Sequence, residues 1–234
     1  MMISIKNLSK LYNGICVLDI PELEIKQGET VGLVGNNGAG KTTLFRCLLD
    51  LIRPSTGQIT SNGLNVQNND QWKSYTGSFL DESFLLDYLS AEEFLTFTGS
   101  LYGQSEVGIQ DFYHTMSGIF NDEVLGKNKY IRDLSKGNQK KIGISAALIG
   151  NPQLLILDEP FTNLDPTSQI RLKQLLRKFN EENNMTMFIS SHDLNHVTEV
   201  CKRIVVIHKG KIAYDLQTNE NTLSELERFF TLAC

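Results

Sequence analysis

The stretch that decides the fold of this chain is Gly35-Asn36-Asn37-Gly38-Ala39-Gly40-Lys41-Thr42. A compact apolar run at residues 30–34 precedes it, and apolar side chains at helical spacing follow it as far as residue 52. Glycines allow several backbone N–H groups to converge on an anion, and the first turn of a helix adds a partial positive charge. The spacing G-x-x-x-x-G-K-[ST] between a predicted strand and a predicted helix therefore predicts a loop that holds nucleotide phosphates.

The residues of this loop have separate expected roles. Lys41 is expected to reach the β- and γ-phosphates of ATP, and the hydroxyl of Thr42 is expected to coordinate Mg²⁺. A chance match to the pattern arises in about 1% of chains of this length, and the strand and helix that flank it make chance a still weaker explanation. The residues that we assign to the nucleotide in this segment are Gly35, Asn36, Asn37, Gly38, Ala39, Gly40, Lys41, Thr42 and Thr43.

An apolar run that ends in two acids supplies the second part of the site. Residues 154–157 have the pattern of a buried strand, and Asp158 and Glu159 follow it directly. Asp158, at a strand end beside the phosphate loop, is suited to hold Mg²⁺ directly or through water. Glu159 is then placed to orient or deprotonate a water that attacks the γ-phosphate. In isolation, two solvated acids at a strand end are an equally good interpretation, and the upstream loop favours the magnesium site.

Strands and helices alternate at both ends of the chain, and the middle is helical. Strand patterns occur at 3–5, 23–25 and 58–62, whereas 90–150 shows helical spacing and no convincing strand. The order predicts an α/β fold, with a P-loop NTPase core, a small antiparallel β subdomain and an inserted α-helical subdomain. We expect a single domain over 1–234, in which 1–85 and 151–234 form the core with its β subdomain and about 86–150 forms the helical subdomain. After residue 150, the predicted strands are 154–157, 185–189, 204–207 and 211–214, and the predicted helices are 167–180, 194–201 and 222–232.

Composition argues against several classes of protein. The hydrophobic fraction of 41% and the charged fraction of 21% are ordinary for a globular chain, and the net charge of −5 argues against binding to nucleic acid. No run approaches the roughly 20 apolar residues of a membrane span, and the first residues alternate like a strand rather than forming a leader. The cysteines are scattered and lack the spacing of a zinc site, so we expect free thiols in a reducing cytosol at Cys16, Cys47, Cys201 and Cys234.

A third segment, Leu134-Ser135-Lys136-Gly137-Asn138-Gln139, lies between the two motifs. Together the three segments resemble an ATP-binding cassette (ABC) ATPase, whose signature is usually Leu-Ser-Gly-Gly-Gln at the start of a helix. The order of elements fits this family over essentially the whole chain. The resemblance implies that Tyr12 stacks on adenine, that 162–165 is the D-loop and that His192 is the switch histidine at the γ-phosphate. By themselves Tyr12 and His192 are weak signals, since a lone aromatic usually packs and a lone histidine is usually an ordinary polar residue.

The resemblance also implies that two ATPase subunits join head to tail and share two composite sites. The helix that begins near residue 136 has an anion-binding N-terminus, but its own chain holds its nucleotide elsewhere. The residues that the resemblance places on the ATP of the partner subunit are Ser135, Lys136, Gly137, Asn138 and Asp165.

Three positions depart from the family pattern. Lys136 replaces the first glycine of the signature and Asn138 replaces its glutamine, whereas Ser135 and Gly137 are retained. Where a Q-loop glutamine usually helps to bind magnesium, the alignment places Asp81. A carboxylate is an acceptable ligand for Mg²⁺, but this side chain is shorter, so we expect contact directly or through water. Glu82, the next residue, is the other candidate for this magnesium ligand.

The expected function is that of the ATP-binding and ATP-hydrolysing subunit of an ABC transporter, at the cytoplasmic face of the membrane and bound to a separate permease. The Leu-Ser-Lys-Gly sequence, the short C-terminus and the acid at position 81 resemble the stand-alone ATPases of ABC-2 type exporters, which favours export. The alternatives are a soluble ABC ATPase of DNA repair or translation and a small-molecule kinase. The acidic charge and the single phosphate loop disfavour the soluble ABC classes, and a kinase has no need of Ser135 and His192.

The permease is expected to contact the surface around residues 83–101. An apolar cluster in this segment either packs inward or marks a contact site, and the two alternatives have about even weight. Acidic residues at its rim would suit a partner helix with an apolar face and a basic edge. The cluster consists of Phe84, Leu85, Leu86, Tyr88 and Leu89.

Overall fold

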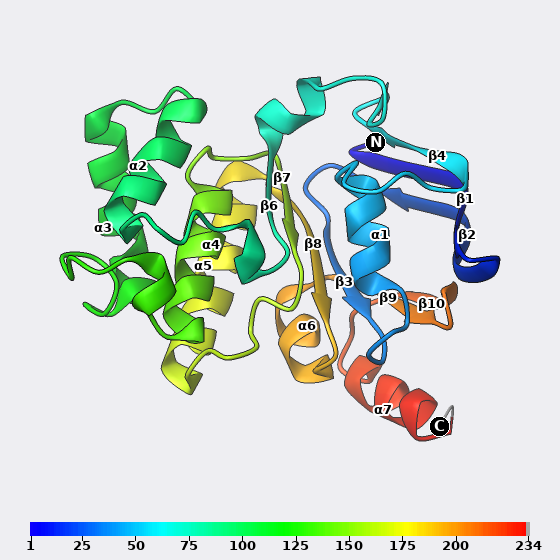
Figure 1. Ribbon diagram of the computed structural model, residues 1–234. Coiled ribbons are helices and arrows are strands. Elements are labelled where there is room, and N and C mark those ends of the chain that lie inside the picture. The colour runs from blue at the N-terminus through cyan, green and yellow to red at the C-terminus, as the bar shows by residue number, and fades with distance from the viewer. Residues whose placement is uncertain (233–234) are drawn as a thin grey trace.

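A six-stranded sheet lies at the centre of the computed structural model, which describes residues 1–232 (Figure 1). Its strand order is β10-β9-β3-β8-β7-β6, and all neighbours pair in parallel except β9 and β10. Only β8 separates β3 from β7, so the loop after β3 and the acids after β7 emerge at the same edge of the sheet. The strands are β3 (Thr30–Val34), β6 (Thr76–Phe79), β7 (Leu154–Leu157), β8 (Thr186–Ser191), β9 (Arg203–His208) and β10 (Lys211–Gln217).

A four-stranded antiparallel sheet is built from the N-terminal third of the chain, in the order β2-β1-β4-β5. Its first two strands are longer than the predicted runs 3–5 and 23–25, because residues 11–16 are exposed on both faces and lack the alternation of a half-buried strand. Tyr12 therefore ends β1 instead of preceding the first strands, which corrects the position expected from the sequence. The strands are β1 (Ile3–Tyr12), β2 (Ile15–Ile25), β4 (Thr56–Ser61) and β5 (Leu64–Asn65).

Helices pack around the central sheet and form an arm at one side of it. In Figure 1, α2 and α3 lie farthest from the antiparallel sheet, and α4 lies between them and the central sheet. The segment 86–150 holds α2, α3 and α4 and no named strand, in agreement with the helical insertion predicted for it. The helices are α1 (Lys41–Leu48), α2 (Ala91–Leu101), α3 (Glu106–Phe120), α4 (Lys136–Leu148), α5 (Pro166–Asn183), α6 (Leu194–Val200) and α7 (Thr222–Leu232).

The two faces of the central sheet belong to two separate hydrophobic clusters. Leu155 and Leu157 of β7 pack in a cluster with residues of the helical arm, α5 and α6. Leu154 and Ile156 of the same strand pack in a cluster with residues of α1, β1 and β2. Successive side chains of a strand point to opposite faces, so one short apolar run fills both cores. Because both faces of β7 are buried, the position along the sheet at which Asp158 follows the strand is fixed.

Strand β6 is absent from the sequence-based prediction, because its four residues are short of apolar side chains and show no alternation. It forms at the edge of the sheet by pairing in parallel with β7. Gly77 permits α4 to pack closely, since a Cβ at this position would lie 1.8 Å from the carbonyl oxygen of Ala147. The strand brings the chain from Trp72 to the acids at 81 and 82.

The thiols and the helices agree with the expectations from composition. Cys16, Cys47 and Cys201 are free thiols, and Cys234 lies outside the described residues. Burial raises the pKa of Cys47 to about 11 and that of Cys201 to about 12, so neither is a reactive thiolate. Within residues 1–232, none of the helices combines the length and the apolar character needed to cross a membrane.

Candidate functional site

The phosphate loop joins β3 to α1 and forms one wall of a pocket of about 250 Å³. Gly38 and Gly40 have φ of 80° and 112°, so the turn into the helix needs glycine. The ammonium of Lys41 donates to the carbonyl oxygen of Gly35 at 2.6 Å and to that of Asn36 at 3.4 Å, which holds it against the loop. The pocket is lined by Tyr12, Val17, Asn37, Gly38, Ala39, Gly40, Lys41, Thr42, Thr43 and Glu159.

Asp158 and Thr42 lie in contact at the base of this region. The Thr42 hydroxyl donates to Asp158 Oδ2 at 2.5 Å, and Ser190 Oγ donates to Asp158 Oδ1. Burial raises the pKa of Asp158 above its usual range, and the hydrogen bonds from Ser190 and Thr42 oppose that rise. Carboxylate and hydroxyl oxygens are the donors that Mg²⁺ takes, together with phosphate and water. The pair therefore has the donors that would hold Mg²⁺ beside the phosphate loop.

Glu159 is held at the pocket by contacts from three other elements. Its Oε2 lies 2.9 Å from Nδ1 of His192, and its Oε1 lies 3.5 Å from the ammonium of Lys41. Its backbone N–H donates to Ser190 Oγ at 2.9 Å. Its φ is 49°, in the left-handed region, which costs a residue with a side chain about 1–3 kcal/mol. The backbone bends here so that the side chain turns toward the phosphate loop.

His192 and Glu159, which the sequence predicts as the catalytic pair, are in direct contact although they follow different strands. His192 lies just beyond β8 and its side chain is half exposed. With the carboxylate ionised, Nδ1 of the imidazole donates to it and leaves Nε2 free for another partner. The contact orients the ring next to the pocket.

Tyr12 lies at the pocket from the side of the antiparallel sheet. Its side chain is half exposed and belongs to the pocket lining. The ammonium of Lys10 lies 5.0 Å from the centroid of the ring, a cation–π distance. A half-exposed ring at the mouth of a phosphate site is suited to stack on a base, and it is not part of either hydrophobic cluster.

The signature residues lie at the start of α4. Ser135 caps α4, with its Oγ accepting from the N–H of Asn138 at 3.2 Å, and Lys136 donates to the side chain of Gln139. Gly137 is required by packing as well, since a Cβ there would lie 2.7 Å from the carbonyl oxygen of Asn163 in the D-loop. None of the signature residues is among those that line the pocket of the phosphate loop.

Asp165 lies on the same side as the signature. It caps α5, and its carboxylate accepts from the N–H and hydroxyl of Ser168. These hydrogen bonds hold the pKa of Asp165 below its usual range, and the ammonium of Lys141 at 3.8 Å adds to the effect. The carboxylate is mostly exposed and remains charged at neutral pH.

Asp81 is not brought to the magnesium pair by any contact of its side chain. Its carboxylate accepts from the N–H and hydroxyl of Ser83, and it lies 4.0 Å from the guanidinium of Arg46. It is not among the residues that line the pocket of the phosphate loop. Its role as a magnesium ligand stays a prediction.

Two residues of the site have no assigned role in the sequence-based prediction. Ser190 binds both Asp158 and the backbone of Glu159, and Lys140 donates to the carbonyl oxygen of Glu159. The contacts of Ser190 follow from the register in which Leu157 pairs with Ile189, which the sequence does not show. Lys140 stands among other polar residues at the start of α4, so its burial has no signal in the sequence.

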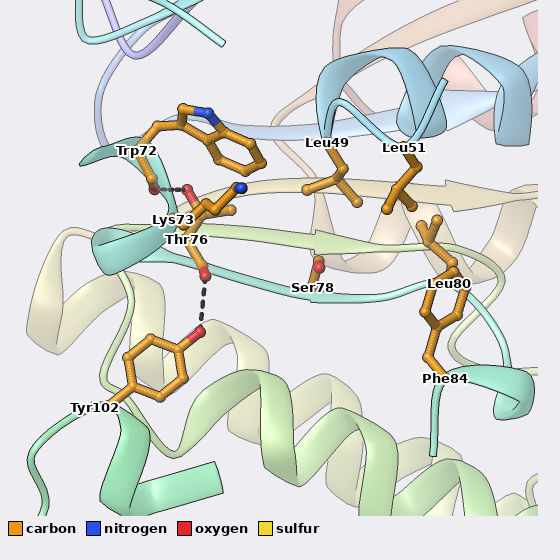
Figure 2. A pocket seen from close by; sticks show the side chains of 9 residues that line it. All are labelled: Leu49, Leu51, Trp72, Lys73, Thr76, Ser78, Leu80, Phe84 and Tyr102. Carbon is orange, nitrogen blue, oxygen red and sulfur yellow. Dashed lines mark hydrogen bonds between the residues drawn. The ribbon is translucent and has the colours of Figure 1, made fainter. Parts of the chain in front are cut away.

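A second pocket, of about 260 Å³, lies beside β6 (Figure 2). Leu49 and Leu51 approach it from the end of α1, Trp72 and Leu80 from the segment around β6, and Tyr102 from the end of α2. The hydroxyl of Tyr102 donates to the carbonyl oxygen of Thr76 at 3.2 Å and joins the arm to the sheet.

The apolar cluster expected near this surface divides into an inner and an outer part. Leu85 is buried, and Leu86 and Leu89 pack against the core of the arm. Phe84 is 50% exposed and lines the second pocket, and Tyr88 is 58% exposed. The inward alternative is therefore correct for Leu85, Leu86 and Leu89, and a contact site at Phe84 and Tyr88 stays a prediction.

Known proteins are similar to this chain in sequence and in fold. The family model described as ABC transporter matches residues 18–162. The bacitracin transport ATP-binding protein BcrA of Bacillus licheniformis is 32% identical, over 92% of this chain and 69% of its own length. The ABC transporter ATP-binding protein NatA of Bacillus subtilis is 35% identical, over 82% of this chain and 78% of its own length. An ABC transporter ATP-binding protein of Synechocystis is 34% identical, and the match spans 53% of its length.

Solved structures with the same fold confirm the predicted α/β architecture. A dimeric ATP-binding cassette, MJ0796, in a post-hydrolysis state with ADP and phosphate, has a TM-score of 0.83 at 24% identity, over 93% of this chain and 99% of that one. An ATP-binding subunit of an ABC transporter has a TM-score of 0.82 at 26% identity, over 99% of this chain and 94% of that one.

Proposed function

This chain belongs to the ABC transporter family as one of its ATP-binding proteins, and on that premise we propose that the pocket at the phosphate loop binds ATP with Mg²⁺ and hydrolyses it. One observation carries the proposal. Lys41, Thr42, Asp158, Glu159 and His192 come from three distant parts of the sequence and are joined by direct contacts. Each has the chemistry that one step of phosphoryl transfer to water requires.

The residues divide the work of binding and chemistry. Tyr12 stacks on the base, and the backbone N–H groups of the loop and Lys41 hold the phosphates. Thr42 and Asp158 hold Mg²⁺, which neutralises phosphate charge, with Asp81 contributing directly or through water. Glu159 accepts a proton from the attacking water, and His192 orients the γ-phosphate or that water.

The signature and Asp165 serve a second copy of the ATPase subunit. Their position outside the pocket of their own chain supports a head-to-tail dimer, in which the start of α4 closes over ATP held by the partner. The similarity to a dimeric cassette supports the same arrangement as a fold-level analogy. Closure then depends on the γ-phosphate, and its loss on hydrolysis reopens the dimer.

The second pocket is proposed to receive a helix of a separate permease at the cytoplasmic face of the membrane. Its apolar residues, among them exposed Phe84 and Leu51, suit the apolar face of a helix, and Asp81 and Glu82 precede Phe84 in the chain and suit a basic edge. Relatives named for bacitracin transport and methionine import support transport in general. We propose export, on the Leu-Ser-Lys-Gly sequence and the acid at position 81.

Co-purification with the permease encoded nearby tests the transport role. Phe84→Glu and Leu51→Glu should abolish association in detergent, because each places a charge in the apolar pocket. Val107→Glu, at an exposed position on α3, is the matched control and should not affect association. If no membrane protein associates and added permease leaves the ATPase rate unchanged, a soluble ABC ATPase of repair or translation becomes the better proposal.

Glu159→Gln tests the chemistry. Glutamine keeps the shape of the side chain but cannot accept the proton, so kcat should fall about 10²–10⁴-fold. ATP affinity should change little, and an ATP-bound dimer should accumulate on a sizing column. Glu181→Gln, at an exposed position on α5, controls for the loss of one negative charge. Wild-type turnover in Glu159→Gln would refute the assignment.

A further inference from the structure

Lys140 is a buried lysine at the junction of the two pockets. It lies in the second turn of α4, and its side chain is only 6% exposed. Its ammonium donates to the carbonyl oxygen of Glu159 at 2.9 Å and to the hydroxyl of Thr162 at 2.6 Å. A buried charge is costly unless it is fully bonded, so its presence at this point needs a reason.

The first reason lies in the backbone of Glu159. This residue has a left-handed conformation, which a residue with a side chain adopts only where its surroundings hold it. Ser190 accepts from its N–H at 2.9 Å, and Lys140 and Thr162 both donate to its carbonyl oxygen. Lys140 is the charged member of these bonds and the one that comes from the signature helix.

The second reason lies on the other side of the ammonium. Glu82 Oε1 is 3.9 Å from Nζ of Lys140 and is otherwise buried without a hydrogen-bond partner. Glu82 begins the short helix Glu82–Phe84, and Phe84 lines the second pocket. Burial lowers the pKa of Lys140, while Glu82, Glu159 and Asp158 oppose that change. The ammonium therefore connects the wall of the second pocket to the backbone of Glu159.

We propose that Lys140 is a positioning residue that holds Glu159 in its hydrolytic conformation and couples it, through Glu82, to the segment that forms the second pocket. The inference rests on the proposed function, in which Glu159 accepts the proton of the attacking water. The hydrogen bond from Lys140 to Glu159 goes to the backbone carbonyl oxygen, and the charge of the ammonium also acts on the Glu159 carboxylate at longer range. Movement of the segment at 82–84 then changes the position of the base without changing the phosphate contacts.

The test is Lys140→Met together with the double variant Lys140→Met/Glu82→Gln. The double variant removes the carboxylate that the single variant leaves buried without its ion pair. In both variants kcat should fall about 10- to 100-fold, the scale of a misplaced catalytic group. ATP affinity should stay at the wild-type value, and the double variant should recover thermal stability but not turnover.

Lys173→Met is the matched control. Lys173 is also a buried lysine, paired with Glu199 at 2.9 Å, but it lies on α5 and has no contact with Glu159. Its loss should lower the melting temperature and leave kcat unchanged. An equal fall of kcat in Lys173→Met would show that the effect is one of stability and would overturn the proposal.

Glu159→Gln separates this inference from the function on which it rests. Slow turnover in Glu159→Gln with wild-type turnover in the double variant would overturn the role of Lys140 alone. Wild-type turnover in Glu159→Gln would overturn the proposed function itself. Failure of both Lys140 variants to fold would assign the residue to core stability and also overturn its positioning role.

Discussion

The two helix starts that are proposed to bind phosphate, at α1 and α4, are built differently. Gly40 precedes α1 in a left-handed conformation and provides no side-chain cap, so the first N–H groups of that helix point into the pocket. Ser135 precedes α4 and accepts from the N–H of Asn138 with its own hydroxyl. The first backbone N–H groups of α1 are therefore free to bind phosphate in a single chain. At the start of α4, one of the first N–H groups is already bound by the Ser135 hydroxyl.

This difference indicates that the start of α1 and the start of α4 have different roles. Around α1, the ammonium of Lys41 and the carboxylates of Asp158 and Glu159 supply charge of both signs. Around α4, two lysines of the helix pair with Glu82, Glu123 and Asp165, and within residues 1–232 the side chains at the start of the helix have no acid as a hydrogen-bond or ion-pair partner. Substitutions at α1 should change binding, and substitutions at α4 should change turnover.

Lys41→Ala should have the largest effect on binding. It removes the charged donor at the phosphate loop, and a lost charged hydrogen bond of this kind lowers affinity about 10- to 100-fold or abolishes it. Titration with a fluorescent ATP analogue measures the change in a single subunit. Unchanged affinity would contradict the assignment of Lys41 to the phosphates, and with it the proposed difference in role between the starts of α1 and α4.

Tyr12→Ala should weaken ATP binding by about 1–3 kcal/mol, the scale of stacking between an aromatic side chain and a base. The same titration applies, and Tyr12→Phe is the control because it keeps the ring. Nucleotide triphosphates with other bases should lose less affinity than ATP if the ring selects adenine, and equal losses would indicate stacking without selection.

Ser135→Ala should leave ATP affinity of the isolated subunit unchanged and lower turnover about 10-fold, since it removes a donor to a developing charge. It also removes a helix cap, which costs about 1 kcal/mol of stability. Ser105→Ala is the matched control, because Ser105 caps α3 by the same contact, accepting from the N–H of Gly108 at 3.2 Å. Equal turnover in the two variants would contradict a role for α4 at a partner's ATP.

The smallest expected effect is the labelling of Cys47, which tests whether α1 stays packed against its core. Cys16 is exposed, whereas Cys47 lies on α1 with its pKa raised to about 11 by burial. In a Cys234→Ser variant at pH 8, maleimide should label Cys16 and leave Cys47 protonated and unreacted. Mass spectrometry after digestion separates the sites. Rapid labelling of Cys47 would mean that α1 opens away from its core.

Local signals in the sequence were sufficient for the loop, for the start of α1 and for the acidic strand end, whereas α1 ends at Leu48 and not near residue 52 as predicted. Residues 30–42 carry their structure in adjacent positions, since an apolar run, glycines and a helix follow one another. The capping box of α2 is local in the same way, since Ser90 and Glu93 form it within four consecutive residues. Motifs of this kind can be predicted without knowing which distant residues they contact.

Other parts of the fold and the site depend on partners that the sequence does not place. Strand β6 forms only because β7 pairs with it, and the outer half of the β1–β2 hairpin has no buried face to produce alternation. The contacts of Ser190 and Lys140 depend on the register between strands and on the seating of α4. The division of the apolar cluster at 84–89 depends on the turn before α2, which decides the side chains that face the core.

The position of β3 has a consequence for how the chain folds. Thr30 pairs with Met187 and Val31 pairs with Arg203, so the strand that supports the loop has both neighbours at the far end of the chain. Closing segments of that length has a large entropic cost, and domains with such distant pairings fold slowly. Helix α1 can form early, but its loop takes its final shape only after β8 and β9 have arrived beside β3. The pocket at the phosphate loop is therefore completed late, after strands from distant parts of the chain have paired.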